Sequence, residues 1–468
     1  MFAPSFSIII QFLVLIVSGA GIFYVAKNPK RAFYILIFSF PLKSLYVWVG
    51  ADIQIWKLIS LAFLLRSIPR LAYGLPLGRS ARSYVSLIYL FIFYVVLITA
   101  VNTLILDETT VYKMIGGFFK NEGRILFQLM FFAITMNLIF IPLLVIRSAS
   151  DAITSLRIFL YALVFLGLLG VVQYVVFHLV GFDLFPIQNI DGTTRSGFVL
   201  GIRDTVFRVN SIAGESKHLA VAMVFGITIL LLCKMNNFKI VKYENTILIM
   251  FLFNLLSSFS TTGIVWASIA LVMLIIIRGV FEWKSILLVL CVSAIGITSF
   301  FNLSEVNRSA VEKQAKRSGF EVQDETILEY FIDQPFHAIT GVGLGNIHHY
   351  SVKYFPPSFP LFRNRPYKAN SGVLYMLADF GLIGMCLLYI PIYLSLRRNI
   401  RVERRYPRKE ISPIIVISRF TLIVSVLFLA RYNELLFICF GLSLSLNSIL
   451  ERNLVPSHTL SKRQRGIV

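Results

Sequence analysis

Basic residues, a glycine and a carboxylate gather where a polar segment meets an apolar helical stretch. In chain order they are Arg195, Arg203, Arg208, Gly214, Glu215, Lys217 and His218. This composition favours anion binding, because the N–H groups and the positive end of the helix dipole point out of a helix start. Glu215 is a candidate general base, since a partly desolvated carboxylate accepts protons near neutral pH. The alternative is that Glu215 is an ordinary acid of a first helical turn, which the dipole favours.

A second polar segment, residues 303–368, is divided by charge. Residues 321–333 contain five acids and no base, whereas the end of the segment contains bases and no acid. The guanidinium group of arginine matches two phosphate oxygens at once, so the basic end favours a phosphate or pyrophosphate group. The alternative is that the two ends pair with each other in water, where ion pairs are common and weak. The basic residues are Lys353, Arg363, Arg365 and Lys368.

An acid also occurs inside an apolar stretch. Asp379 is the single charged residue of the apolar sequence 369–396. Acids at membrane depth are costly, and they are therefore candidates for a functional role. Gly381 and Gly384 follow Asp379, so we expect the helix to be broken or closely packed at this point.

Two adjacent histidines and a glycine-rich run complete the set of candidate residues. His348 and His349 lack the spacing of a metal motif such as HExxH, so no metal site is predicted. They are candidates to supply a base from a spatially adjacent position. The run Gly341–Asn346 lacks the strand–glycine–helix context of a nucleotide-binding loop, and it predicts a tight turn instead.

The elements that position these residues belong to a mostly apolar chain. It has 468 residues, of which 57% are hydrophobic and 14% charged, and its net charge is +21. Soluble domains carry roughly 25% charged residues. A soluble nucleic-acid-binding protein is therefore excluded. Long continuous apolar runs indicate helices and not a barrel, so we predict an all-α polytopic membrane protein with about 12–14 transmembrane helices.

Thirteen apolar stretches are predicted as helices. Some of them, including the third, seventh and eighth, are short and are expected to be tilted, broken or partly re-entrant. The stretches are Ser5–Ala26, Ala32–Val49, Ile53–Leu65, Tyr84–Leu104, Gly123–Ile146, Ile153–Val180, His218–Cys233, Thr246–Ser257, Gly263–Ile277, Ser285–Asn302, Ala369–Leu396, Ile414–Leu429 and Leu435–Leu450.

The charges of the connecting segments predict the orientation of the chain. With the N-terminus outside, the inner connections carry 25 Lys and Arg against six Asp and Glu. Cytoplasmic loops carry such an excess of basic residues. We therefore predict a periplasmic N-terminus and a cytoplasmic C-terminus. The expected parts are N-terminal transmembrane helices (1–182), a first long periplasmic loop (183–217), central transmembrane helices (218–302), a large periplasmic loop containing short helices (303–368), and C-terminal transmembrane helices with a basic cytoplasmic tail (369–468).

Four segments together resemble the O-antigen polymerase and ligase superfamily of bacterial surface-polysaccharide assembly. Asp333–Asn346 resembles the proline and GxGxG turn of the family's large periplasmic loop, and Ala369–Gly384 resembles the signature that closes that loop. Phe207–Ala220 is similar to the arginine-containing end of the other loop, and Ser257–Ile275 is similar to a Ser/Thr-Gly helix start. The four segments occur in the family's order, and Arg203 and Gly214 match a polymerase spacing.

The resemblance implies a GT-C-like glycosyltransferase of the bacterial plasma (inner) membrane. Such an enzyme takes no nucleotide sugar as its donor and requires no cofactor. A polymerase of this family transfers a growing glycan from undecaprenyl pyrophosphate to an undecaprenyl-pyrophosphate-linked oligosaccharide repeat unit. The lipid bilayer and a chain-length regulator protein are the further partners that the family implies. The implied pyrophosphate-binding residues are Arg203, Arg208, Arg363 and Arg365, and the auxiliary residues are Lys217, His218, His348, His349, Lys368 and Asn370.

One departure from the family pattern favours a polymerase. Ligases have a histidine at the start of the closing signature, where this chain has Ala369 or Asn370. The catalytic base is thereby left open, with Glu215 as the first candidate and Asp379 as the second. The alternatives are an O-antigen ligase and a flippase of lipid-linked oligosaccharides. Flippases have related halves and small outer loops, and neither feature is evident in this sequence.

Overall fold

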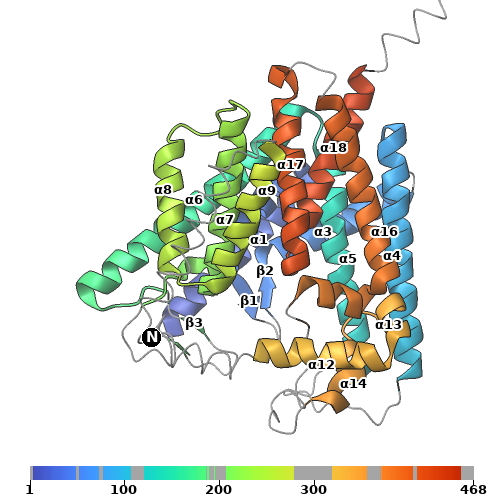
Figure 1. Cartoon of the computed structure of the whole chain (residues 1–468). Coiled ribbons are helices and arrows are strands. Elements are labelled where there is room, and N and C mark those ends of the chain that lie inside the picture. Colours follow the sequence, from blue (N-terminus) through green and yellow to red (C-terminus); the bar gives the residue numbers. More distant parts are fainter. Residues whose placement is uncertain are drawn as a thin grey trace, which may run out of the picture. The chain divides into compact units, whose positions relative to one another are not determined.

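A computed structural model describes most of the chain, and it is mainly helical, as predicted (Figure 1). The predicted helix Ser285–Asn302 lies outside the described residues. These are residues 4–48, 52–72, 77–106, 121–185, 187–188, 194–195, 207–278, 319–355, 369, 371–403 and 408–454.

The chain forms two compact units, which are described separately. The first comprises residues 1–69, 145–316 and 406–423, and the second comprises 70–144, 317–405 and 424–468. Each element is given with the unit that holds most of its residues. The first unit has α1 (Pro4–Lys27), α2 (Pro29–Ser39), β1 (Tyr46–Trp48), β2 (Asp52–Gln54), α3 (Ile55–Ala72), α6 (Ala149–Val180), β3 (Ile187–Gln188), β4 (Thr194–Arg195), η2 (Ser211–Ala213), α7 (Ser216–Met235), α8 (Glu244–Ser257), α9 (Thr261–Arg278) and α17 (Arg408–Ala430). The second has α4 (Arg79–Ile105), α5 (Asn121–Val145), α12 (Gly319–Asp333), α13 (Pro335–Thr340), α14 (Ile347–Ser351), η3 (Val352–Tyr354), α16 (Gly372–Glu403) and α18 (Leu435–Leu454).

The chain between α2 and α3 differs from the prediction of one helix over Ala32–Val49. Helix α2 ends at Ser39, and a short antiparallel pair follows, in which Tyr46 lies opposite Gln54. Pro41 explains the helix end, because proline has no N–H group with which to continue the helical hydrogen bonds. The β-branched and aromatic residues that follow favour an extended backbone.

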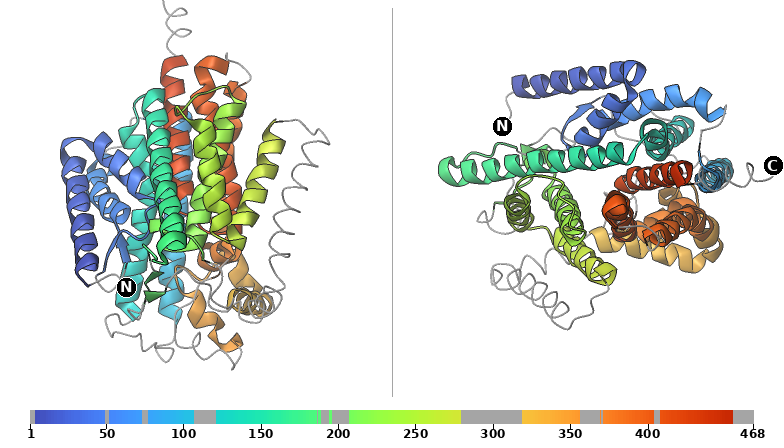
Figure 2. Two further views of the ribbon diagram at one scale, coloured as in Figure 1. Left: turned by 90° about the vertical axis from the view of Figure 1, so that its left-hand side faces the viewer. Right: turned by 90° about the horizontal axis from the view of Figure 1, so that it is seen from above.

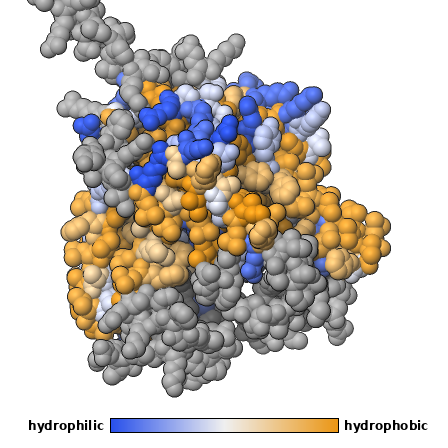
Figure 3. Space-filling view, turned by 180° about the vertical axis from the view of Figure 1, so that it is seen from behind, coloured by the Kyte–Doolittle hydropathy of each residue, from blue (hydrophilic) through white to orange (hydrophobic). Residues whose placement is uncertain are grey.

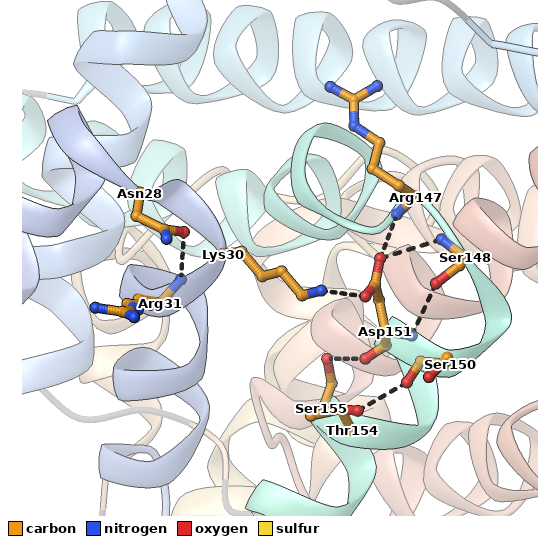
Figure 4. A network of polar contacts seen from close by, with 9 residues as sticks. All are labelled: Asn28, Lys30, Arg31, Arg147, Ser148, Ser150, Asp151, Thr154 and Ser155. Carbon is orange, nitrogen blue, oxygen red and sulfur yellow. Dashed lines mark hydrogen bonds and ion pairs between the residues drawn. The ribbon is translucent and has the colours of Figure 1, made fainter.

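The start of α6 is held by a capping box (Figure 4). Ser148 Oγ accepts the N–H group of Asp151 at 3.2 Å, and Asp151 Oδ2 accepts the N–H groups of Arg147 and Ser148 at 3.1 and 3.2 Å. Lys30, from α2, forms an ion pair with Asp151. The hydrogen bond that Lys30 donates to the Asp151 carboxylate within this ion pair raises the pKa of Lys30. The box explains why α6 begins at Ala149, four residues before the predicted start.

We expect replacement of Asp151 by alanine to lower the free energy of unfolding by about 2 kcal/mol, because the N–H groups of Arg147 and Ser148 lose their carboxylate acceptor and Lys30 loses its ion-pair partner. Thermal unfolding of the detergent-solubilised chain measures the effect. Ser150→Ala is the control, since this exposed residue lies in the same turn and contributes only its main-chain carbonyl to the network. Equal unfolding temperatures of the Asp151 variant and the native chain would show that the box has no stabilising effect.

Helix α7 lies at the centre of the first unit. It packs against α6, α8 and α9 (Figure 2, green to yellow helices). Most of its side chains are buried, including Leu219, Met223 and Leu230 at 0% exposure. A helix that is apolar on all sides is typical of a buried position. The start of α7, where the candidate Glu215 lies, is therefore built on the core of this unit.

Helices α4, α16 and α18 pack together in the second unit. Phe91 of α4, Phe132 of α5 and Phe380 of α16 form an aromatic cluster with ring centroids 5.2–6.1 Å apart. The short helices α12 and α13 also contact α16. Helix α12 runs across the axes of α4 and α16 (Figure 1).

Helix α16 is broken within the predicted stretch Ala369–Leu396. Gly381 has φ 66° and ψ 177°, which a residue with a side chain rarely adopts. The break is packed against Gly341, and Val342 donates a hydrogen bond to Ala378 O at 2.8 Å. The expectation of a broken or closely packed helix after Asp379 is confirmed.

Six described helices are long and apolar enough to cross a membrane. On the face shown in Figure 3, the described side chains are largely hydrophobic, with hydrophilic side chains gathered towards one edge. The structure thus indicates a multi-pass helical membrane protein. The six helical segments are Ala81–Ile105, Ile125–Val145, Ala149–Val180, Ser216–Met235, Gly372–Arg401 and Ser412–Ala430, and shorter apolar helices cover Gln11–Lys27, Glu244–Ser257, Thr262–Arg278 and Leu435–Glu451.

Candidate functional site

A buried glutamine ties the segment 207–213 to α6. Gln173 is 0% exposed, and its Oε1 accepts the N–H groups of Asn210 and Ser211 at 3.1 and 2.7 Å. Its Nε2 donates to Asp183 Oδ1 at 2.8 Å and to Asn210 Oδ1 at 2.7 Å. Buried polar groups are costly unless they are hydrogen-bonded. Because both its oxygen and its nitrogen are hydrogen-bonded, the Gln173 side chain holds the segment 207–213 in one position.

Arg208 lies within this fixed segment, between two anchored neighbours. The ring of Phe207 stacks on Phe177 with centroids 3.8 Å apart, and Val209 donates to Ser257 O at 3.1 Å. Arg208 Nε donates to Ser258 O at 3.0 Å, at the C-terminal end of α8. The negative end of the helix dipole favours a cation at this position.

The guanidinium group of Arg208 is suited to bind an anion. Arg208 is partly buried, and burial lowers its pKa, whereas the nearby charge of Glu215 raises it. Within the described part of the chain, its two terminal nitrogens have no hydrogen-bond partner. A partly desolvated guanidinium group with these N–H groups can donate hydrogen bonds to two oxygens of a phosphate or carboxylate group.

The start of α7 brings three further candidates into this unit. Glu215 is the N-cap residue, but its side chain makes no capping hydrogen bond and forms an ion pair with Lys217 instead. The carbonyl of Glu215 accepts the N–H group of His218 at 2.9 Å, which begins the helix. Both members of the ion pair are partly exposed, Lys217 at 35% and Glu215 at 46% of the side chain. Glu215 thus interacts electrostatically with Arg208 and pairs with Lys217, and His218 lies in the first turn of the same helix.

We expect Gln173→Leu to loosen the segment that carries Arg208. Leucine has a similar volume but leaves the N–H groups of Asn210 and Ser211 without their buried acceptor, at about 1–3 kcal/mol for each group. Hydrogen exchange of residues 207–215 should become faster. Val172→Ala is the control, because Val172 is a 48% exposed neighbour on α6. Equal exchange in the Gln173 variant and the native chain would contradict the anchoring role.

The second unit contains Asp379 at the break of α16. Asp379 is 4% exposed, and its Oδ1 accepts the N–H group of Gly345 at 3.2 Å. Tyr375, one turn earlier, also interacts with it. These contacts join α16 to the predicted glycine-rich turn, in which Gly341, Gly343 and Gly345 all have positive φ. In this structure the carboxylate of Asp379 therefore positions the turn.

Helices α12, α13 and α14 form a layer around an aromatic core. Tyr330 Oη hydrogen-bonds to His337 Nδ1, and Tyr354 Oη donates to Asp333 Oδ2 at 2.7 Å. Burial raises the pKa of Tyr330 and lowers the pKa of His337. The prediction of short helices in this segment is confirmed for its described part. The buried core that the layer shares with Ala378 of α16 consists otherwise of Ile327, Tyr330, Phe331, Val342, Ile347 and Phe355.

His348 and His349 belong to α14 and are buried. They are 1% and 7% exposed, and their ring centroids lie 5.8 Å apart. Burial, assisted by the adjacent His349, lowers the pKa of His348 to about 3. A ring with this pKa is neutral at physiological pH and is a poor proton acceptor. The two residues pack within the layer of α12 to α14.

Lys353 lies in η3, with its ammonium group over the ring of Tyr354. The remaining candidates lie outside the part of the chain whose side chains are described. Arg195 belongs to β4, whose backbone pairs with β3. The other residues are Arg203, Arg363, Arg365, Lys368 and Asn370. Their roles stay predictions from the sequence.

The residues that support Arg208 were not predicted from the sequence. Gln173 lies in an apolar stretch, Asn210 lies two residues after Arg208, and Ser258 contributes a main-chain carbonyl. A lone glutamine within the predicted span Ile153–Val180 is the signal that could have indicated the anchor, because an amide at membrane depth requires hydrogen-bond partners. The main-chain carbonyl of Ser258 could not be recognised in this way, because every residue has such an acceptor.

Comparison with known proteins gives no match, either to models of protein families or to curated protein sequences. The class of protein is therefore judged from its own sequence and structure. Its described part is helical and includes six helices long and apolar enough to cross a membrane. Its first unit carries an anchored arginine beside a helix start, and its second unit carries a buried aspartate beside a helix break.

Proposed function

We propose that this protein is a polysaccharide polymerase, similar to the O-antigen polymerases. It transfers a growing glycan from undecaprenyl pyrophosphate to a lipid-linked oligosaccharide repeat unit on the outer face of the bacterial plasma membrane. The observation that carries the proposal is Arg208, an anchored and partly buried guanidinium group beside the start of α7. The resemblance of four ordered sequence segments to the polymerase and ligase superfamily supports the same reaction.

The reaction requires stabilisation of a leaving pyrophosphate group. The bond between C1 of the donor sugar and the pyrophosphate oxygen breaks, and undecaprenyl pyrophosphate leaves with the electron pair. A new bond forms between C1 and a hydroxyl oxygen of the acceptor sugar, whose proton passes to a base. Arg208 stabilises the negative charge that grows on the leaving oxygen, since fixed donors directed at developing charge lower the barrier. Arg203, Arg363 and Arg365 are the further arginines of the proposal.

Glu215 is the better of the two candidates for the base. Its carboxylate is 46% exposed, so an acceptor hydroxyl can reach it, and its partner Lys217 can move to the phosphate. Asp379 is buried and already accepts a hydrogen bond from Gly345. We therefore assign Asp379 to positioning the glycine-rich turn and Glu215 to proton transfer, with Lys217 and His218 as auxiliary residues.

Deletion of the gene in its native host, followed by gel analysis of surface polysaccharide, tests the proposed function. A polymerase predicts the loss of long chains while single repeat units are kept. Loss of all repeat units would point to a flippase or a ligase instead. An unchanged ladder would contradict the whole proposal.

A further inference from the structure

Helix α12 has three distinct sides. Thr326, Ile327 and Tyr330 form a buried side that faces the aromatic core. The exposed arc is divided into an apolar flank and an acidic flank. Leu328 and Ile332 are one helical turn apart on the apolar flank, with exposures of 47% and 77%. The exposed acids Glu325, Glu329 and Asp333 follow the acidic flank at the same spacing.

The apolar flank continues into α13. Phe336 is 68% exposed and Ile339 is 47% exposed. Four large apolar side chains are thus exposed along a segment of twelve residues, Leu328–Ile339. A surface helix of a soluble domain places charged residues on its exposed side. A helix with a buried side, an apolar exposed flank and a charged flank is suited to three environments: the protein core, the lipid and the water.

Hydrogen bonds attach the end of α13, the following turn and α14 to the apolar stretch of α4. Tyr94 Oη donates to Thr340 O at 2.6 Å, Leu344 N donates to Thr99 Oγ1 at 3.0 Å, and Tyr350 Oη donates to Asn102 O at 3.0 Å. All three α4 residues lie within the apolar stretch Ala81–Ile105.

The exposed stripe of α4 extends past this attachment. Leu97, Val101 and Leu104 are 50%, 42% and 86% exposed. Helix α4 continues beyond Tyr94 for about three turns, or roughly 16 Å. Thr340, which contacts Tyr94, therefore lies at a level where α4 still presents apolar side chains to lipid. Helix α13 is joined to α4 at that level, and α12 runs across the axis of α4 (Figure 1).

We propose that the apolar flank of α12 and α13 enters the outer boundary between headgroups and hydrocarbon of the bilayer that α4 crosses. Leu328, Ile332, Phe336 and Ile339 lie in the lipid, while Glu325, Glu329 and Asp333 lie in water. The layer of α12 to α14 is thus a partly immersed element of the membrane-embedded protein. Interfacial helices bury the large apolar side chains of one side at this boundary and keep the polar side in water.

Spin labels on the full chain in nanodiscs test the inference. Single cysteines replace Leu328, Ile332 and Phe336 on the apolar flank, and Glu329 and Asp333 serve as matched controls on the acidic flank. The background chain lacks the four native cysteines, and it is used after its unfolding temperature has been shown to equal that of the native chain. The nanodiscs contain phosphatidylethanolamine and phosphatidylglycerol. Collisions with oxygen, which concentrates in lipid, are compared with collisions with a water-soluble nickel complex.

The apolar-flank labels should collide several-fold more with oxygen than with the nickel complex, and the acidic-flank labels should show the reverse. Equal nickel collisions on both flanks would overturn the proposal, because the apolar flank would then be in water. Low collisions with both reagents on the apolar flank would also overturn it, because protein would then cover this flank. A photo-crosslinking amino acid at residue 332 of the native chain provides a second measurement. Crosslinks to phospholipid support the proposal, and crosslinks to protein alone contradict it.

Discussion

Replacement of Arg208 by lysine should reduce glycan extension at least about 100-fold, the size of effect seen when one fixed donor to a developing negative charge is lost. Lysine keeps the positive charge but lacks the planar fork that binds two phosphate oxygens. It also loses the donor to Ser258 O, which orients the guanidinium group. The rate of polymer formation by the purified variant measures the effect.

Arg157→Lys is the matched control for this prediction. Arg157 Nε also donates to a main-chain carbonyl, Ile240 O, at the same distance of 3.0 Å and within the same unit. By the predicted orientation, however, Arg157 lies on the cytoplasmic side. We expect extension by the Arg157 variant to stay close to the native rate. Equal losses in the two variants would assign Arg208 a structural role, and normal extension by the Arg208 variant would remove it from the reaction.

Replacement of Gly381 by alanine should lower the free energy of unfolding by about 3 kcal/mol or more, since a side chain is forced into a glycine-only conformation and against the backbone. Gly381 has φ 66° and lies against Gly341, which itself has φ 76°. A Cβ atom on Gly341 would lie 2.6 Å from Gly381 N, so Gly341→Ala should have a similar effect. Thermal unfolding in detergent and the yield of the membrane-inserted chain measure both effects.

Gly19→Ala is the control for the glycine variants. Gly19 lies within α1, and a Cβ atom built on it meets nothing within 4 Å. Alanine is a better helix former than glycine, so this variant should be as stable as the native chain or slightly more stable. An unchanged unfolding temperature in Gly381→Ala would show that the break in α16 does not require glycine.

Much of the helical architecture could be predicted from the sequence, because apolar runs of this length have few stable alternatives in a membrane. The predicted Tyr84–Leu104 and Ile153–Val180 correspond to α4 and α6. Two observed helix boundaries differ from the predicted ones because of local residues. Pro41 ends α2 before the predicted residue, and the Ser148–Asp151 capping box begins α6 earlier. The predicted count of about 12–14 spans rests on length and hydropathy alone, and six described helices meet the stricter length and apolarity criteria.

The position of part of the candidate site follows from local sequence. Glu215, Lys217 and His218 lie at the start of α7, and Arg208 lies in the short segment before it. The anchor Gln173 is 35 residues before Arg208, and no local pattern connects the two. The contact between Asp379 and Gly345 likewise depends on how α16 folds back on a distant turn. Such long-range pairings are set by packing, which hydropathy patterns do not encode.

The most direct test of the proposed function uses the purified full chain and synthetic undecaprenyl-pyrophosphate-linked repeat units, with no nucleotide sugar added. We expect a ladder of longer lipid-linked glycans and the release of undecaprenyl pyrophosphate, with both reduced at least about 100-fold in Arg208→Lys. Absence of any ladder from a correctly folded chain that moves the lipid-linked oligosaccharide across vesicle membranes would contradict the account and identify a transporter.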